Sequence, residues 1–513
     1  MLKAIQSGLV LGLLLTAGCA SHRGPVATAP TAITAADAAT EALAREIGAR
    51  FDDANFANAH FGVLIKSLDT GKVLYERNAE RLFMPASNQK ILTTASALIN
   101  LGPDFTFDTV VSHTGEIKGD TLDGDLVVIG NGDPTLYTRF HKDSRDVFRQ
   151  WADKLKERGI TTISGSIIGD DDAWSDSHTG NGWPFDDLTP WYYAEFGPLT
   201  LNENYIDITI TPPAEVGGEV TLTPNVPSSY FKLINKLEVV ADGRNSIEMS
   251  RPHFSNEITI SGRVKAGGPA VEETPTITNP TLWYVWVLKE TLEAEGITVR
   301  GDAVDCDAVE GWAQRRENLP VIVTQKSPPL SEILMGLMKR SQNMYAETMI
   351  YAQGQKAAAK GTFSNGRKAI QDALATIGVE PDEYQYSDGS GLSRYNYVSP
   401  AVLVRVYEEM LKGPFKDFWW EAQAVAGEQG TLRNRGKGPL ARNMRGKTGL
   451  ISNVRALSGY VKSADGEQFA FSFLCNGHTR SSGELDALYD GVATLLAEKG
   501  APPVAAEKPV AGN

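Results

Sequence analysis

The middle of the chain has a β-strand pattern, whereas the segments on either side also contain helical patterns. This difference constrains the fold more than any other feature. From about residue 110 to 280, short β-rich stretches such as "YIDITITPPAE" and "EITISGRVKAGG" are separated by turn residues. Before this region, "HFGVLIKSLDTGKVLYERNAE" predicts a hairpin. After it, helical periodicity returns in "LSEILMGLMKRSQNMYAETMIYAQG", and a second hairpin and a closing helix follow. This order predicts an α/β domain interrupted by a large β-rich insertion.

Length and charge narrow the class of protein. The 513 residues are too many for one ordinary core, so roughly two or three domains are expected. A formal net charge of -14 offers no basic patch for nucleic acid. The seven histidines form no H-E-x-x-H motif, and no cysteine pair has zinc spacing. No metal and no cofactor is predicted, although this pattern leaves carboxylate sites open.

The two ends of the chain have the composition of processing and tether segments. Residues 1–19 contain a lysine, an apolar stretch and then small residues, which predicts a signal peptide. The run ending at Cys19 resembles a bacterial lipobox, although the commonest lipobox has leucine where Thr16 stands. Cys19 is therefore a candidate for lipidation, and ordinary cleavage nearby is the alternative. Residues 20–44 and 501–513 are interpreted as a disordered tether and tail.

A signal peptide implies export, which sets the expected location of the protein and allows disulfides to form. We expect an exported, periplasmic protein, and Ala20 after the cysteine favours an outer-membrane anchor if the cell has such a membrane. Cys306 and Cys475 are the remaining cysteines. A disulfide between them is possible outside the cytoplasm, and two buried free thiols are the alternative.

The segment "FMPASNQKILTTASAL" places Ser87 three residues before Lys90, where an apolar helix begins. Residues i and i+3 share one face of a helix, so the amine of Lys90 can lie beside the hydroxyl of Ser87. A neutral lysine there could remove the serine proton and activate the oxygen as a nucleophile. The alternative is a plain helix cap, because serine at a helix start is usually one.

Two further motifs favour the interpretation of Ser87 as a nucleophile over a helix cap. "KRSQNMYAE" contains Ser341 and Asn343 in an S-x-N pattern, and "MRGKTGLIS" contains the run Lys447-Thr448-Gly449. S-x-x-K, S-x-N and K-T-G in this order are the signature set of the serine penicillin-recognising enzymes. The complete set is far more specific than any one of its members.

Each member of the set has a chemical task. Ser341 would relay a proton toward the leaving amine, and Asn343 would offer its amide to Lys90 and to the substrate backbone. Lys447 would supply positive charge that holds Lys90 neutral and attracts a substrate carboxylate, to which Thr448 would donate a hydrogen bond. Gly449 would let the substrate lie close to its strand. Backbone N–H groups of Ser87 and Leu450 are the natural pair of donors for the tetrahedral oxyanion.

Four more segments extend the likeness: "GNGDPTL", "SPPLSEILMGLMKRSQNMYAE", "SDGSGLSR" and "GEQGTLRNR". Together with the three motifs, they make residues 45–500 resemble the class C low-molecular-mass penicillin-binding proteins. These are the D-alanyl-D-alanine carboxypeptidase/endopeptidases of the penicillin-binding protein 4 type. The resemblance implies a β-lactamase/transpeptidase-like serine hydrolase domain. It would consist of residues 45–106 and 280–500, with an insertion over 107–279 in which one domain is nested inside another.

The resemblance also implies a substrate and a reaction. Ser87 would attack the bond between the two terminal D-alanines of a peptidoglycan stem peptide, or the D-alanyl–diaminopimelate cross-link, and form an acyl-enzyme. β-Lactams would acylate the same serine. In "NGWPFDDLTPWYYAEFGPLTLNEN", Asp187 best matches a family aspartate that binds the free amino end of diaminopimelate. Its neighbour Asp186 and a plain turn role beside Pro190 are the alternatives.

One departure from the family pattern bears on the substrate. The family usually has serine or threonine after Lys-Thr-Gly, whereas this chain has Leu450, which removes a hydroxyl from the site of the terminal carboxylate. This departure disfavours carboxypeptidase activity more than endopeptidase activity. Three rival functions remain open at this point: a serine β-lactamase, an esterase on the same fold, and a wall-binding scaffold with an inactive site.

Overall fold

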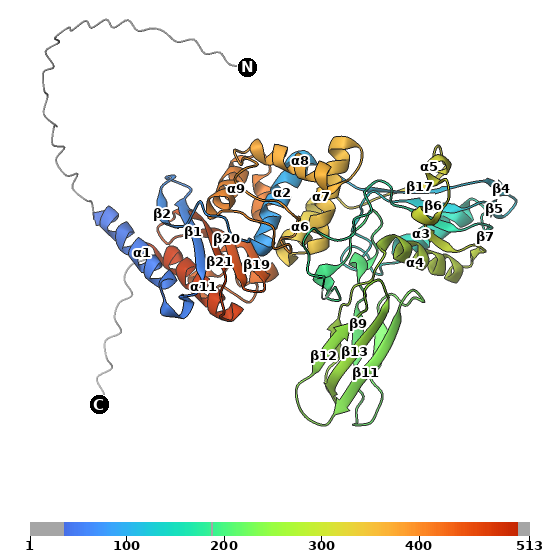
Figure 1. The fold of residues 1–513 in the computed structure, drawn as a ribbon, viewed down its shortest axis with the longest axis horizontal. Helices are drawn as coiled ribbons and strands as arrows, with labels where there is room; N and C mark the ends of the chain where they lie inside the picture. The colour runs from blue at the N-terminus through green and yellow to red at the C-terminus, as the bar shows by residue number, and fades with distance from the viewer. Residues whose placement is uncertain (1–34, 186–187, 501–513) are drawn as a thin grey trace, which may run out of the picture. The chain divides into compact units, whose positions relative to one another are not determined.

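The computed structural model describes residues 35–185 and 188–500 (Figure 1). It separates into a short N-terminal unit that ends at Leu43 and a main unit that begins at Ala44. Helix α1 (Ala35–Phe51) begins inside the segment 20–44 that was expected to be a disordered tether. Its sequence, "AADAATEALAREIGARF", is rich in alanine, glutamate and arginine, which favour helix. Within the described ranges, no helix has both the length and the apolar character to cross a membrane.

A six-stranded antiparallel sheet forms the base of the catalytic part, in the order β18-β19-β20-β21-β1-β2. Both expected hairpins are present, β1 with β2 and β20 with β21. Helix α9 packs on β1 and β21, and α11 packs on β20. Because successive residues of β20 and β21 are buried, both faces of the sheet are covered. The bounds are β1 (His60–Ser67), β2 (Val73–Arg77), β18 (Ala424–Val425), β19 (Arg445–Ile451), β20 (Val454–Lys462), β21 (Gln468–Asn476), α9 (Pro400–Lys412) and α11 (Ser482–Glu498).

A group of helices surrounds α2 (Gln89–Asn100), whose first ten residues are all buried. Helices α6, α7, α8 and α9 contact it on several sides. The single helical stretch expected over residues 330–354 is two helices, because the chain breaks at Ser341 and Gln342. The bounds are α6 (Leu330–Arg340), α7 (Asn343–Ala358), α8 (Phe363–Ala375) and α10 (Lys416–Ala422).

The β-rich region contains two larger sheets, ordered β16-β8-β6-β3-β17 and β15-β7-β5-β4. Helices α3 and α4 pack on them, and side chains from both helices and both sheets share one core. The bounds are β3 (Asp108–His113), β4 (Glu116–Lys118), β5 (Thr121–Asp123), β6 (Leu126–Ile129), α3 (Asp146–Glu157), β7 (Thr162–Ile163), β8 (Ile167–Asp170), α4 (Pro280–Ala294), β15 (Thr298–Val299), β16 (Ala303–Asp305), α5 (Trp312–Arg315) and β17 (Val321–Lys326).

The expected end of the insertion, residue 279, cuts through this sheet and its core. Strand β17 pairs with β3 along its length, and α4 contributes buried side chains to the same core. The sequence boundary missed this because the helical periodicity of α4 resembles that of the catalytic part. We therefore propose that the inserted region runs from Asp108 to Lys326.

Two three-stranded sheets, β10-β9-β14 and β11-β13-β12, lie between the two halves of the larger sheets in the sequence. Their strands are consecutive along the chain, and this arrangement supports the proposal that one domain is nested inside another. The bounds are β9 (Ile208–Thr211), β10 (Thr221–Pro224), β11 (Lys232–Val240), β12 (Ser246–Ser250), β13 (Glu257–Lys265) and β14 (Val271–Glu273).

The inserted region is fastened to the helices of the catalytic part by a buried contact. Trp174 is almost fully buried and donates its indole N–H to Gln355 Oε1, 2.9 Å away. The backbone of Gly361 exchanges hydrogen bonds with the residues on either side of Trp174. A Cβ at Gly361 would lie 2.3 Å from the indole ring, so only glycine allows this close approach.

Candidate active site

Ser87 lies in a short 3-10 turn, η2 (Ala86–Asn88), directly before α2. Its Oγ lies 3.1 Å from Lys90 Nζ, as the shared helix face predicts. The caps of this turn and of α2 are Pro85 and Asn88, and neither makes a side-chain capping hydrogen bond. The serine hydroxyl therefore faces the lysine instead of capping the helix.

Lys90 is completely buried, and its Nζ has three oxygen neighbours. Besides Ser87, Nζ donates to Asn343 Oδ1 at 2.6 Å and to the Ser390 carbonyl at 2.7 Å. Burial lowers the pKa of Lys90 to about 7, although the carboxylates of Asp388 and Glu347 act in the opposite direction. A neutral amine has two N–H groups for the two shorter contacts and one lone pair for the Ser87 hydroxyl. This arrangement suits proton abstraction near neutral pH.

Two buried carboxylates shape the loop that presents the Ser390 carbonyl. Glu347 Oε atoms accept the backbone N–H groups of Gly389 and Ser390 at 3.0 and 2.9 Å. Asp388 accepts the backbone N–H groups of Gly391 and Ser393 at 2.7 and 2.6 Å. Burial raises the pKa of Glu347, and the neighbouring charge of Asp388 acts in the same direction. Sequence reasoning noted "SDGSGLSR" only as a likeness and assigned neither carboxylate. The signal available was an Asp-Gly-Ser-Gly run, which is typical of a tight turn.

Ser341 and Asn343 occupy the break between α6 and α7. Ser341 has a left-handed backbone, with φ of 63°, a conformation that non-glycine residues rarely adopt. Asn343 begins α7, accepts from Lys90, and donates its Nδ2 to the backbone carbonyl of Tyr192 at 2.8 Å. Tyr192 belongs to η3 (Trp191–Tyr193) of the inserted region. The insertion therefore contacts the S-x-N motif directly.

A second contact from the insertion holds the middle residue of this motif. Glu203 is fully buried in η4 (Asn202–Asn204), where three successive non-glycine residues are left-handed. Its carboxylate accepts from Gln342 Nε2, and from Tyr345 Oη at 2.6 Å. Arg139 pairs with it through two nitrogens, both at 2.8 Å. No sequence motif pointed to Glu203, because its partners in the catalytic part, Gln342 and Tyr345, lie more than a hundred residues away along the chain.

Lys447 comes from β19 and is also completely buried. Its Nζ donates to Ser341 Oγ at 2.8 Å and to the Thr448 carbonyl at 2.8 Å. Burial lowers the pKa of Lys447 well below its ordinary value, and the nearby charges of Lys90 and Arg455 act in the same direction. This differs from the expected role of Lys447 as the charge that keeps Lys90 neutral. Burial itself is the largest cause of the lowered pKa of Lys90.

The rest of the K-T-G motif lies beside Ser87. Thr448 donates its Oγ1 to Thr431 Oγ1 at 2.8 Å. A Cβ at Gly449 would lie 2.8 Å from the Pro85 carbonyl and 3.1 Å from Ser87 N, so glycine is needed for β19 to approach the serine turn. From the sequence, Gly449 was expected only to leave room for the substrate beside its strand. Leu450 is 53% exposed, and its side chain borders the open site.

A cavity of about 780 Å³ opens over these residues. Ser87, Ser341, Asn343, Thr448 and Leu450 form part of its wall. The inserted region contributes Pro184, Trp191, Tyr192 and Tyr193, and the catalytic part also contributes Arg340, Arg394 and Thr431. Asp186 and Asp187 lie outside the described residues, as does Cys19, so their predicted roles stay predictions.

Two other sequence questions have a structural answer. Cys306 and Cys475 are both buried free thiols, which matches the second alternative from the sequence.

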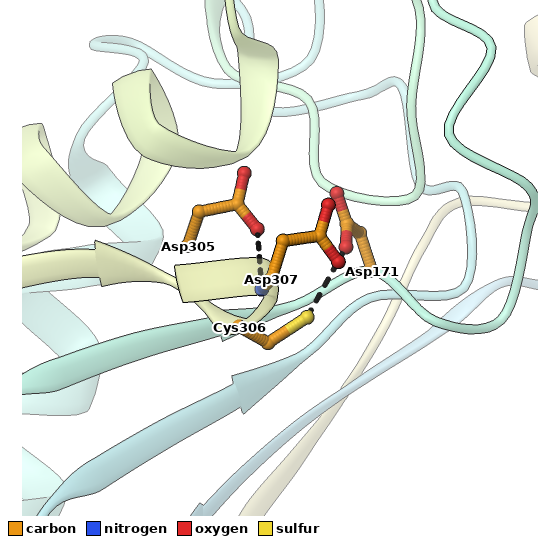
Figure 2. Close-up of side chains that lie close together, drawn as sticks. All are labelled: Asp171, Asp305, Cys306 and Asp307. Carbon is orange, nitrogen blue, oxygen red and sulfur yellow. Dashed lines mark hydrogen bonds between the residues drawn. The ribbon is translucent and has the colours of Figure 1, made fainter. Parts of the chain in front are cut away.

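In the part of the chain that the structure describes, Asp171, Asp305, Cys306 and Asp307 lie close together (Figure 2). Asp171 accepts from Thr281 Oγ1 at 2.5 Å and from Cys306 Sγ at 3.4 Å, and Asp305 accepts the backbone N–H of Asp307 at 3.2 Å.

A buried lysine beside a serine, with a second serine–lysine pair across the same cavity, defines a serine acyl-transfer enzyme. Comparison with known proteins identifies the family. The sequence model of the D-Ala-D-Ala carboxypeptidase 3 (S13) family matches residues 43–499. The chain belongs to this family of serine peptidases, and the resemblance expected from the motifs is confirmed.

Individual relatives agree over most of their length. A "D-alanyl-D-alanine carboxypeptidase" of Actinomadura sp. (strain R39) is 32% identical over 491 residues, which cover 91% of this chain and 87% of the relative. "D-alanyl-D-alanine carboxypeptidase DacB" of Haemophilus influenzae is 26% identical and covers 84% of this chain and 87% of its own. The crystal structure of penicillin binding protein 4 (dacB) from Haemophilus influenzae has the same fold. Its TM-score is 0.75 at 24% identity, covering 88% of this chain and 99% of that one.

Proposed function

We propose that this chain is a penicillin-binding serine D,D-peptidase of peptidoglycan. It would cleave the terminal D-Ala-D-Ala bond, the D-Ala–diaminopimelate cross-link, or both. The observation that carries the proposal is the buried Lys90 amine, 3.1 Å from Ser87 Oγ, with a pKa lowered to about 7. Family membership supports the substrate class. A serine β-lactamase or an esterase on the same fold remains the alternative.

Acylation begins when neutral Lys90 takes the proton of Ser87 as Oγ bonds to the substrate carbonyl carbon. The oxygen of that carbonyl becomes an oxyanion, which accepts the backbone N–H groups of Ser87 and Leu450. Collapse of the intermediate breaks the carbon–nitrogen bond. The proton that Lys90 took passes to the departing nitrogen through the hydroxyl of Ser341, whose Oγ is 2.8 Å from Lys447 Nζ, and Lys90 is neutral again. Water then adds to the acyl carbon while Lys90 takes one of its protons, and Lys90 returns that proton to Ser87 Oγ as the acyl–oxygen bond breaks.

The remaining groups position the substrate. Asn343 orients Lys90 through Oδ1, and the Tyr192 carbonyl fixes the other end of its amide. A substrate carboxylate bound by Thr448 would lie close to Lys447 and would favour the protonated form of that lysine. We also propose that Asp187 binds the free amino end of diaminopimelate. Comparing Asp187→Asn with Asp186→Asn on substrates with and without that amine tests this assignment.

The location is part of the same proposal. We propose that the enzyme is exported to the periplasm and anchored by a lipid on Cys19, because its substrate is the cell wall and residues 1–19 have the composition of a lipoprotein signal. Mass spectrometry of the mature N-terminus tests it. An unmodified terminus created by cleavage elsewhere would contradict the lipid anchor.

Acylation by a fluorescent penicillin, followed by intact mass, tests the function. Wild type and Ser364→Ala, an exposed serine on α8, are expected to gain one penicillin per chain, and Ser87→Ala none. Digestion of purified muropeptides then determines which bond is cleaved. Rapid release of the drug by wild type would favour the β-lactamase alternative. Labelling of Ser87→Ala would contradict the assignment of the nucleophile.

A further inference from the structure

A second cavity, of about 540 Å³, adjoins the active-site cavity between the inserted region and the catalytic part. Trp191, Arg340 and Thr431 line both cavities. The other walls come from both parts of the chain: Tyr137, Arg139, Tyr205, Asp207 and Thr274 on one side, and Lys339, Gln342, Gln429, Gly430 and Arg433 on the other. A ligand that fills the active site can therefore continue into this second cavity past Trp191, Arg340 and Thr431.

The second cavity is cationic in a chain with a net charge of -14. The guanidinium groups of Arg340 and Arg433 have no hydrogen-bond or ion-pair partner among the described residues. Lys339 donates to a neutral acceptor, Gln429 Oε1, at 2.7 Å. The charge of Arg139 is paired with Glu203. Three cations are thus available to an anionic ligand.

Asp207 is the carboxylate in the wall of this cavity, and it opposes the three available cations. Asp207 accepts from Tyr137 Oη at 3.1 Å and from Asn225 Nδ2 at 2.7 Å. Gln342 also borders the cavity and is 2% exposed. Its Nε2 is committed to Glu203, whereas its Oε1 is buried without a hydrogen-bond partner in the described residues. The cavity therefore offers both cations for carboxylates and a buried acceptor for an amide N–H.

The position of the cavity relative to the scissile bond indicates which part of a substrate reaches it. The leaving nitrogen is protonated through Ser341, and Arg340 is the residue before it. Thr448, which is expected to bind groups on the leaving side, donates to Thr431 at 2.8 Å. Both Arg340 and Thr431 line the second cavity.

We propose that the second cavity binds the leaving-group strand of a cross-linked substrate, a peptide rich in carboxylates. Arg340, Arg433 and Lys339 pair with its carboxylates, and Gln342 Oε1 accepts one of its amide N–H groups. This inference rests on the proposed D,D-peptidase function. It makes the enzyme selective for cross-links, because a single terminal D-alanine is too small to leave the active-site cavity and enter the second one.

Kinetics on two substrates test the proposal, with Arg433→Gln as the variant and Arg442→Gln as its control. Both arginines are exposed, but Arg442 lines neither cavity and pairs with Glu428. For Arg433→Gln we expect kcat/KM on a purified cross-linked dimer to fall about fivefold, the effect of one exposed ion pair of about 1 kcal/mol. The loss is expected in KM. Turnover of a monomeric pentapeptide and acylation by penicillin stay within about twofold, since error of a few tenths of a kcal/mol is usual.

Charge reversal at Arg433 and raised salt provide two further tests of the ion pairs in the second cavity. Arg433→Glu is expected to weaken dimer cleavage more than Arg433→Gln, and raised salt is expected to lower wild-type cleavage of the dimer alone. Equal losses on dimer and monomer, or no loss on the dimer, would overturn the inference while leaving the peptidase function intact. Failure of wild type to cleave either peptide or to bind penicillin would overturn the peptidase function itself, and with it this inference.

Discussion

The two sides of the active site are held by buried carboxylates, but these come from different parts of the chain. On the Lys90 side, Glu347 and Asp388 both belong to the catalytic part and accept mainly backbone N–H groups of one loop. On the Ser341–Asn343 side, Glu203 comes from the inserted region and accepts from Gln342 and Tyr345 of the catalytic part. The Lys90 side receives one contact from the insertion, the indole N–H of Trp183 at 3.0 Å from Asp388 Oδ2, whereas the carboxylate that holds the Ser341–Asn343 side itself comes from the insertion.

This difference gives the insertion a role beyond covering the site. Ser341 is left-handed and Gln342 ends the break between two helices, so their geometry has little support from local structure. Glu203 and the Tyr192 carbonyl supply that support from outside. Changes on the Lys90 side should therefore alter proton transfer, and changes at Glu203 should alter the position of the S-x-N motif.

The largest expected effect comes from removing the base on the Lys90 side. Lys90→Met keeps an apolar stem in the buried site but removes the amine that takes the Ser87 proton. The acylation rate by fluorescent penicillin is expected to fall about a thousandfold, within the range for a general base. Lys72→Met, an exposed lysine before β2, serves as the control. A loss of less than about tenfold would exclude Lys90 as the base, since general bases contribute more.

The next largest effect is expected at Glu203, on the side held by the insertion. Glu203→Gln leaves Arg139 without its charged partner, so we expect the free energy of unfolding to fall by about 3 kcal/mol. Penicillin acylation is expected to slow about tenfold in the variant that remains folded, as displacement of a positioned group does. Denaturant titration measures the free energy of unfolding, and stopped-flow labelling measures the acylation rate. The exposed Glu272→Gln serves as the control.

A double-mutant cycle separates positioning from simple loss of stability. If Glu203 acts through Gln342, the effects of Glu203→Gln and Gln342→Ala on the acylation rate will be far from additive. Additive effects would show that Glu203 stabilises the junction without positioning the motif.

The pH dependence of acylation distinguishes the two sides. The active form of Lys90 is neutral, so the rate is expected to rise with pH through a midpoint near 7. Asp388→Asn removes a charge that raises the pKa of Lys90, so its midpoint is expected at lower pH. Glu203→Gln is expected to leave the midpoint unchanged, because Glu203 does not contact Lys90. Equal shifts in both variants would erase the distinction between the sides.

The smallest expected effect is at Leu450. Leu450→Ser restores the hydroxyl that the family usually has beside the terminal carboxylate, so the ratio of carboxypeptidase to endopeptidase activity is expected to rise a few-fold, about 1 kcal/mol for one added hydrogen bond. Muropeptide digests of pentapeptide and cross-linked dimer measure the ratio. Leu450→Ala separates the hydroxyl from the loss of the leucine side chain. An unchanged ratio in Leu450→Ser would contradict the hypothesis.

The parts of the candidate site that lie on short motifs could be predicted from the sequence. The Ser87–Lys90 pair follows from helix periodicity, and the other two motifs follow from their order along the chain. The fold class and both hairpins were also predictable, because the turn residues and β-rich runs are local signals. The end of the insertion was not, since α4 and β17 join its core only through long-range pairing.

The sequence by itself therefore determined the family and the general architecture of this protein, and it predicted the reacting groups. Only the tertiary structure decided how those groups are held: the left-handed Ser341, the Glu203 contact with Gln342, and the shared burial of Lys90 and Lys447. The physical reason is that pKa values and buried hydrogen bonds depend on what surrounds a group in space. Residues from the insertion and the catalytic part meet only after the chain has folded.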